Sequence, residues 1–147
     1  MSSKPFIIAP GDRSTALNVV GTKVTVLASQ ANAQDQQITL QSGPERMGPP
    51  AHSHDWDESF YVTRGQIRFI CGGETRICTE GTFVHVPAGT VHAFSSGPGG
   101  GEMLEITGRR SKAVRMFSAL DREIPPESPD IAAVIQVLGE HGVKVHP

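Results

Sequence analysis

The chain has 147 residues, of which 37% are hydrophobic and 19% charged, and this length fits one globular domain over residues 1–147. Its net charge of −2 provides no basic surface for nucleic acid or for an anionic membrane. No apolar run is long enough to span a bilayer, and the apolar stretch near the start is too short for a signal peptide. We therefore expect a cytoplasmic protein without a nucleic-acid or membrane partner.

Short β-rich segments alternate with turns from residue 18 to residue 107, after residues 1–17, which we expect to form an arm or an edge strand. Strands at such regular spacing are typical of a sandwich or a barrel. The expected strands are Val19–Ala28, Gln37–Leu40, Ser59–Thr63, Gln66–Cys71, Glu74–Cys78, Thr82–Val86, Val91–Phe94 and Met103–Thr107. The glycine-rich segment 97–101 is expected to form a flexible hairpin tip. The sequence thus predicts an all-β fold.

A helical pattern is recognised only near the C-terminus, in residues 129–142. Apolar residues recur there at i, i+3, i+4 and i+7 from Ile131 to Leu138, and Gly142 follows as a stop signal. We expect this helix to pack on the outside of the barrel. The preceding stretch Asp121–Pro129 contains three prolines, so it is expected to be an irregular connector.

The two cysteines flank a predicted turn at Gly72-Gly73. A two-residue hairpin there pairs Cys71 with Glu74 and Ile67 with Cys78. In this register the two thiols share a face but lie too far apart along the strands for a disulfide. We expect reduced core cysteines, with a redox or metal role as the alternative.

Four of the six histidines lie in two segments bracketed by glycine and proline, residues 49–58 and 81–92. His52 and His54 are two residues apart, so in an extended strand both imidazoles point to one face. Glu58 has the same parity, and the polar residues between it and His54 must bend the chain for the three to meet. His92 follows a turn that reverses the chain and is able to bring in a fourth ligand. Three imidazoles and one carboxylate suit a divalent first-row metal.

These residues fall into two motifs through which the sequence resembles the cupin superfamily. The first motif, Gly-x5-His-x-His-x3-Glu-x6-Gly, is matched by His52, His54, Glu58 and Gly65, with the opening glycine out of register. The second motif, Gly-x5-Pro-x-Gly-x2-His-x3-Asn, is matched by Gly81, Pro87, Gly89 and His92, with Ser96 in place of asparagine. The motifs cover residues 48–96, and the rest of the chain is similar to small single-domain cupins of the quercetin-dioxygenase-like group. The resemblance implies a cupin jelly-roll β-barrel with a short C-terminal helix.

The resemblance also implies a metal-dependent enzyme, foremost an oxidoreductase of the dioxygenase type. His52, His54, Glu58 and His92 would then hold one divalent ion, which could be Fe, Mn, Ni, Zn, Cu or Co. An ion with open positions binds O2 or a chelating oxygen of a small-molecule substrate. By similarity to flavonol-cleaving relatives, Glu58 is also the catalytic candidate, because it could leave the metal and take a proton from the substrate.

The predicted cavity around this metal is apolar. Phe60 and Val62 share the face of Glu58, and Ile67 and Phe69 are expected to point inward from the next strand. An apolar cavity favours an aromatic or otherwise unsaturated substrate. Ordinary core packing is the alternative explanation for these four residues.

The other histidines, and the polar and aromatic residues next to the proposed ligands, are interpreted as follows from their positions. His85 is expected to be a surface or interface histidine rather than a support for a ligand. Asp55 and Asp57 are expected to be solvated turn residues, with orientation of a histidine as the alternative. Trp56 is interpreted either as a lid over the cavity or as part of the wall. His141 and His146, near the end of the predicted helix, are expected to be structural.

Two further functions remain open on the sequence. One is a non-catalytic module that binds a metal or a small molecule, and the other is a metal-assisted isomerase or decarboxylase that does not use O2. The sequence identifies neither the substrate nor the metal. A homodimer is expected, because the edge strands of a half-open barrel need cover and the N-terminal arm is able to provide it.

Overall fold

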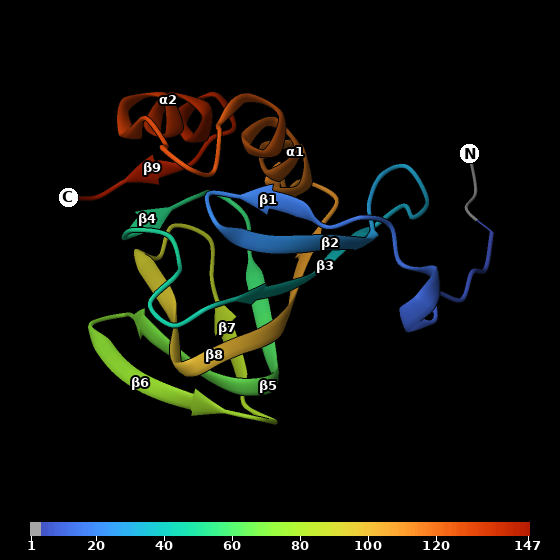
Figure 1. The fold of residues 1–147 in the computed structure, drawn as a ribbon, viewed down its shortest axis with the longest axis horizontal. Helices are drawn as coiled ribbons and strands as arrows, with labels where there is room; N and C mark the ends of the chain where they lie inside the picture. Colours follow the sequence, from blue (N-terminus) through green and yellow to red (C-terminus); the bar gives the residue numbers. More distant parts are fainter. Residues whose placement is uncertain (1–3) are drawn as a thin grey trace.

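The computed structural model describes residues 4–147. In this part of the chain one nine-stranded antiparallel sheet curls into a half-barrel, and two helices lie over one end of it (Figure 1). The strands are β1 (Leu17–Val19), β2 (Thr22–Ala28), β3 (Gln36–Gly43), β4 (His52–Ser53), β5 (Glu58–Cys71), β6 (Glu74–Thr79), β7 (Phe83–Val86), β8 (His92–Gly108) and β9 (Lys144–Val145). The helices are α1 (Ala113–Glu123) and α2 (Ile131–Glu140), and a short 3-10 turn, η1, covers Pro10–Asp12. The expected β-barrel class is confirmed.

The two longest strands, β5 and β8, pair along almost their whole length, from Glu58 opposite Thr107 to Cys71 opposite His92. The sequence predicted each as two shorter strands separated by glycines, and the expected hairpin tip at residues 97–101 is wrong. The register shifts in this region, so the glycine-rich segment forms a bulge within β8 and the strand continues beyond it. A Cβ on Gly101 would come within 2.5 Å of the Gln66 carbonyl oxygen, so the two backbones approach too closely for a larger residue.

The hairpin between β5 and β6 has the predicted register, with Cys71 opposite Glu74 and Ile67 opposite Cys78. Both cysteines are free thiols. Cys78 is buried, and the half-buried Cys71 packs against the same core. Burial raises the pKa of both thiols, which keeps them protonated and unreactive at neutral pH.

The lower core fills the barrel below the end that the helices cover. Its aromatic centre is a group of three rings with centroids 5.1–5.6 Å apart, formed by Phe60, Phe69 and Phe94. Val62 and Ile67 are buried in the same cluster. The residues that were expected to line an apolar cavity around the metal therefore pack in this core, as the alternative interpretation had it. They are Phe60, Val62, Ile67 and Phe69.

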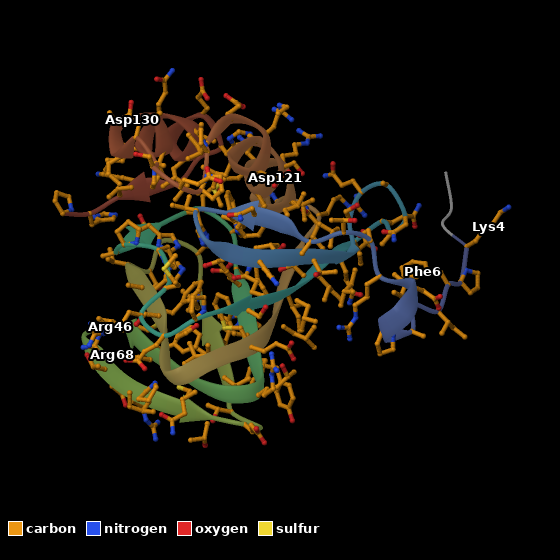
Figure 2. All side chains as sticks on the ribbon, viewed as in Figure 1. Lys4, Phe6, Arg46, Arg68, Asp121 and Asp130 are labelled. Atoms are coloured by element: carbon orange, nitrogen blue, oxygen red, sulfur yellow. The ribbon has the colours of Figure 1, made fainter. Side chains whose placement is uncertain are left out.

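The upper core lies between the barrel and the two helices. Met116, Phe117 and Leu120 of α1 pack there with Val24 of β2 and Trp56. The sequence prediction missed α1, and Asp121–Glu123 belong to this helix rather than to the connector. Figure 2 shows Asp121 beside β1, where its carboxylate accepts a hydrogen bond from the Asn18 backbone N–H at 2.7 Å.

Helix α2 forms where the sequence predicted a helix. Its first turn is capped by Asp130, whose carboxylate accepts a hydrogen bond from the Ala132 backbone N–H at 3.0 Å. At the other end Gly142 has a φ of +78°, and the Val143 N–H donates to the Leu138 carbonyl at 2.9 Å. The chain then forms β9, which pairs with β4, so that α2 sits at the mouth of the barrel and not on its outer face.

Residues 4–16 form an arm and not an edge strand, apart from the short turn η1, and residues 1–3 of the expected arm lie outside the described residues. Figure 2 shows Lys4 and Phe6 at the far end of this arm, away from the barrel. The side chain of Ile7 is almost fully exposed. Among residues 4–147, neither α1 nor α2 has the length and apolar character that a membrane-crossing helix requires.

Candidate metal centre

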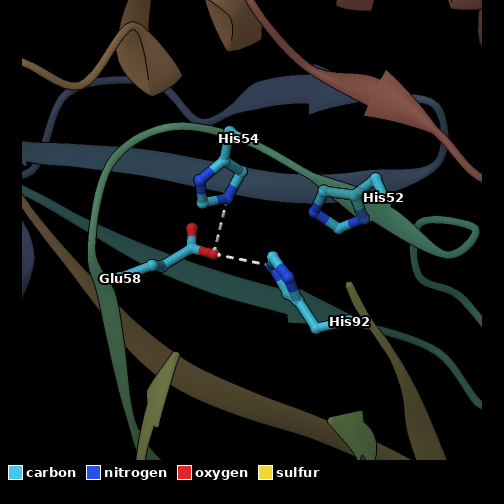
Figure 3. Close-up of side chains that lie close together, drawn as sticks. All are labelled: His52, His54, Glu58 and His92. Atoms are coloured by element: carbon cyan, nitrogen blue, oxygen red, sulfur yellow. Dashed lines mark hydrogen bonds and ion pairs between the residues drawn. The ribbon is translucent and has the colours of Figure 1, made fainter. Parts of the chain in front are cut away.

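A buried cluster of three histidines and one glutamate lies at the mouth of the barrel (Figure 3). His52 comes from β4, His54 from the turn that follows, Glu58 from the start of β5 and His92 from the start of β8. One ligand atom from each side chain lies within 4.8 Å of the others. The structure therefore brings together all four residues that the sequence singled out.

The bend that the sequence required between His54 and Glu58 is present at residues 55–57. It is held by backbone hydrogen bonds, since the Gly89 N–H donates to the His54 carbonyl at 2.8 Å. The Ala88 N–H donates to the Asp57 carboxylate at 2.9 Å. These contacts fix the turn against the loop before His92, and they bring His54 Nε2 to 3.3 Å from Glu58 Oε1.

All three imidazoles are oriented by backbone carbonyl groups. In each ring Nδ1 lies within hydrogen-bond distance of a carbonyl oxygen two residues away. These oxygens belong to Pro50, Trp56 and Thr90, at 2.8, 3.0 and 2.9 Å. A proton on Nδ1 makes this bond and points Nε2 at the centre of the cluster, where it would offer its lone pair to a metal ion. The rings are thus held as metal ligands usually are, through their second nitrogen.

The acidic residue Glu105, which the sequence analysis missed, lies beside Glu58. It is buried on β8, opposite Phe60 of β5, and its carboxyl group accepts a hydrogen bond from Thr39 at 2.9 Å. Burial, and then the charge of Glu58, raise the pKa of Glu105 well above its usual value. Glu105 is therefore a neutral acid that donates a hydrogen bond to Glu58. Its signal in the sequence was a lone acid on the inward face of an apolar strand.

The hydrogen bonds around Glu58 decide its charge. Burial alone would raise its pKa, but the hydrogen bonds from Glu105, His54 and His92 outweigh burial and lower it. Glu58 is therefore an ionised carboxylate in a dry site. The pKa of His92 is raised in the same environment. Burial lowers it, but the hydrogen bonds to Glu58 and to the Thr90 carbonyl raise it by more.

His52 is a neutral imidazole at neutral pH. Burial and, after it, the proximity of His92 lower its pKa to about 4. Its side chain lies next to His92, with the ring centroids 4.2 Å apart. At neutral pH its Nε2 is therefore a free lone pair, which is the form that binds a metal.

The pKa of His52 predicts how the stability of the metal-free protein depends on pH. Between pH 6.5 and about 4 the unfolded chain binds a proton at this histidine that the folded chain does not. The free energy of unfolding should therefore fall as the pH drops through this window, by up to about 3 kcal/mol. Urea unfolding in a chelator at both ends of the window measures this loss. His52→Asn should show a shallower pH dependence, and equal slopes in the two proteins would contradict the assignment.

Trp56 forms part of the wall and not a lid. Its ring stacks on His54, with centroids 4.3 Å apart and planes within 9°, and its other face packs in the upper core. The indole Nε1 is buried without a hydrogen-bond partner among the described residues. Trp56 thus fixes His54 by ring contact on one side while the carbonyl of its own backbone fixes Nδ1.

The remaining histidines lie outside the cluster. His85 is partly exposed on the outer face of β7, where its ring contacts the Ser59 hydroxyl at 2.8 Å and the Asp57 carboxylate at 3.6 Å. His141 contacts the Val137 carbonyl in the last turn of α2, and His146 contacts the Ser53 hydroxyl. None of these three reaches the cluster.

A cavity of about 370 Å³ lies between the cluster and the helices. Its floor consists of His52, His54, Glu58 and Glu105, and Trp56 and Phe94 form its sides. The opposite wall is made by apolar residues of β2, α1 and α2. The expectation that Phe60 and Val62 line the cavity is wrong, because these residues lie in the core beneath its floor.

The region that contains this cluster matches a family model. The model describes a cupin domain and covers residues 39–107, from β3 to β8, including every residue of the cavity floor. Residues 39–107 match the cupin domain, and the chain has the cupin fold. The two motifs found in the sequence are therefore family motifs, and their departures at the first glycine and at Ser96 leave the four buried side chains in place.

The chain is similar to one named protein in sequence and to several solved structures in fold. Quercetin 2,3-dioxygenase from Bacillus subtilis is 31% identical over 93 residues, which make up 61% of this chain and 27% of that protein. The fold is shared with an RmlC-like cupin from Shewanella frigidimarina, at a TM-score of 0.64 and 16% identity over 74% of this chain and 95% of the other. KdgF from Halomonas has a TM-score of 0.67 and 15% identity, covering 76% and 99% of the two chains.

The three imidazoles and the carboxylate of the cluster fit a divalent transition metal. Imidazole and carboxylate are ligands that Fe, Mn, Ni, Zn, Cu and Co accept. The Nε2 atoms of the three rings are already directed inward, and Glu58 supplies one negative charge where burial makes an isolated charge costly. The cysteine thiols lie on the hairpin of β5 and β6 and contribute no ligand to the cluster.

Proposed function

We propose that this cupin is a metal-dependent oxidoreductase of the dioxygenase type that acts on a small aromatic or otherwise unsaturated substrate. The observation that carries the proposal is the position of the three-histidine, one-glutamate cluster at the floor of an apolar cavity, with His52, His54 and Glu58 lining that floor. His52, His54, Glu58 and His92 would hold one divalent ion. When bound, that ion supplies open positions for O2 and for an oxygen atom of the substrate.

The protein residues bind the substrate, exclude water and move its proton. The apolar wall removes water from the floor, which strengthens electrostatic interactions there. Glu58 is the proposed proton acceptor for a substrate hydroxyl group. Against the effect of burial, its pKa is lowered by its hydrogen bonds and then by the charge of His54, so the carboxylate becomes more basic when the contacts with His54 and His92 are given up. Glu105 then remains as the hydrogen-bond donor that keeps Glu58 in position.

Elemental analysis combined with oxygen consumption tests this proposal. The purified protein should contain about one divalent metal ion per chain, or accept it on reconstitution. A panel of flavonols and other unsaturated compounds should include one that disappears together with an equal amount of O2. Turnover without O2 uptake would instead indicate an isomerase or a decarboxylase. Binding without turnover would indicate a non-catalytic module, and a protein that takes up no metal would contradict the metal site.

We also propose that two copies of this chain associate through the outer face of the sheet. A row of apolar side chains crosses four neighbouring strands there, formed by Leu40, Leu104, Tyr61 and Phe83 in register. Tyr61 and Phe83 are 42% and 62% exposed. The ion pair of Arg64 with Glu102 lies toward one end of this face, and the contact of the His85 ring with the Asp57 carboxylate lies toward the other, so the row itself carries no charged side chain.

The oligomeric state checks this association. Light scattering after size-exclusion chromatography should give the mass of a dimer, and Phe83→Asp should convert it to a monomer because the substitution buries a charge in the interface. Ile77→Asp, on β6 and outside the row, is the matched control and should leave the dimer intact. A monomeric wild-type protein would rule out the association.

A further inference from the structure

The cavity above the cluster has an unusual distribution of charge. All of its titratable side chains lie on the floor, where they belong to two histidines, His52 and His54, or to the two buried glutamates. The side walls and the wall opposite the floor are apolar, with only Gln41 and Thr22 as further polar side chains. Among the lining residues within 4–147 there is no lysine and no arginine. A carboxylate or phosphate in the upper part of the cavity would therefore lose its hydration without gaining a partner.

The wall opposite the floor is made by the two helices. Met116, Phe117 and Leu120 of α1 form its buried part. Ile131, Val134, Ile135 and Leu138 of α2 continue it, because their spacing places them on one side of the helix. The helices are thus the part of the chain that a bound molecule would touch farthest from the cluster.

Two of these α2 residues line the cavity and are also open to solvent. Ile131 is 63% exposed and Ile135 is 45% exposed, so they form the rim at which the cavity meets the surface. Large apolar side chains at a rim make an apolar path from solvent to the floor. A molecule that enters there passes apolar side chains before it reaches a polar group.

We propose that Ile131 and Ile135 of α2 select a substrate that enters beside this helix with an uncharged, apolar body and presents its one polar group to the cavity floor. This inference rests on the proposed function in taking the cavity as the substrate site. It adds the charge of the substrate, the path of entry and two residues that determine specificity.

A pair of phenols of nearly equal shape tests the selection. Para-isopropylphenol is neutral, whereas para-hydroxybenzoate carries a carboxylate in place of the isopropyl group. Calorimetric titration of the protein as purified, and again after chelation, compares their dissociation constants. In the chelated protein, where no cation is able to hold the carboxylate at the floor, the neutral phenol should bind at least about tenfold more tightly.

Substitution at the rim assigns the selection to α2. Ile135→Lys places a cation at the mouth, so it should weaken binding of the neutral phenol and strengthen that of the benzoate, narrowing the preference at least about fivefold. Ile131→Lys is the second variant and should act in the same direction. Both positions are exposed enough for a lysine, and thermal melts confirm folding. Ile77→Lys, at a site 54% exposed on β6, is the control that should change neither constant.

The outcomes separate this inference from the proposed function. Equal binding of the two phenols, no binding of either, or the same response in Ile135→Lys and Ile77→Lys would each overturn the inference. If the phenols show the expected preference but the protein takes up no metal or consumes no O2, the selection stands and the oxidoreductase proposal fails. If the protein takes up metal and consumes O2 but shows no preference between the phenols, the oxidoreductase proposal stands and the selection by α2 fails.

Discussion

Replacing His52 and His54 together with alanine is expected to lower the metal content from about one ion per chain to less than roughly a tenth of that value. The variant keeps only Glu58 and His92 of the four donors. Two donors are fewer than the three protein ligands of an ordinary catalytic site, and the lost imidazoles are the two that β4 and the following turn hold in place. Mass spectrometry of the untagged protein gives the metal content directly.

The matched control for this variant is His85→Ala. His85 belongs to the same segment, residues 81–92, as the ligand candidate His92. Its ring, however, lies on the outer face of β7 and does not reach the cluster. It should leave the metal content unchanged, and circular dichroism should show that both variants fold. Metal retained at the wild-type level in the double variant would show that the ion is held elsewhere.

Phe60→Ala is expected to have the largest effect on stability, lowering the free energy of unfolding by about 3–5 kcal/mol. Phe60 is fully buried, and its ring lies 5.1 Å from that of Phe69 and 5.3 Å from that of Phe94. The substitution removes the centre of this group and leaves a cavity that the surrounding strands fill only partly. A loss of this size is a large part of the stability of a typical domain.

Urea unfolding measures the loss, with Phe60→Leu as the comparison. Leucine keeps most of the apolar volume, so this variant should lose about 1 kcal/mol. If Phe60→Ala also loses less than about 1 kcal/mol, the packing of the lower core has been overestimated. The core that these variants change lies directly beneath Glu58, which is two residues before Phe60 on the same face of β5.

The parts of the fold that could be predicted from the sequence are those fixed by local patterns. The Gly72-Gly73 turn determines the register of β5 and β6, and the alternation of side chains puts both His52 and His54 on one face. The turn before His92 indicated that this residue could join them, and the family motifs supported it, although the pairing of β4 with β8 that brings them together joins distant parts of the chain.

The missed elements depend on contacts between distant residues or on a weaker pattern. Helix α1 carries Ala113, Met116, Phe117 and Leu120 at helical spacing, a signal that was present but lay between a strand and a proline-rich stretch. The role of Glu105 depends on its position beside Glu58 across two strands, which strand parity alone does not give. The cavity wall could not be predicted because it is formed by the helices that cover the barrel mouth.

The glycines illustrate a different limit. Gly65 and the glycine-rich segment 97–101 suggested breaks, since glycine weakens a strand. In the folded protein they allow β5 and β8 to approach each other and continue, because a side chain at Gly101 would collide with the backbone of β5. The same residue type thus signals either a turn or a close approach, and only the partner strand decides which.

The cavity floor and the helical wall come from consecutive, separate stretches of the chain. The floor residues all lie between β4 and β8, whereas the wall of α1 and α2 follows after β8 has ended. Mutations in the C-terminal stretch therefore alter the molecules that fit without touching the groups that would perform the chemistry. Because the cluster and the helical wall are encoded separately, related proteins could differ in the helices and keep the cluster. An engineer could likewise exchange or randomise the helical segment in search of new substrates.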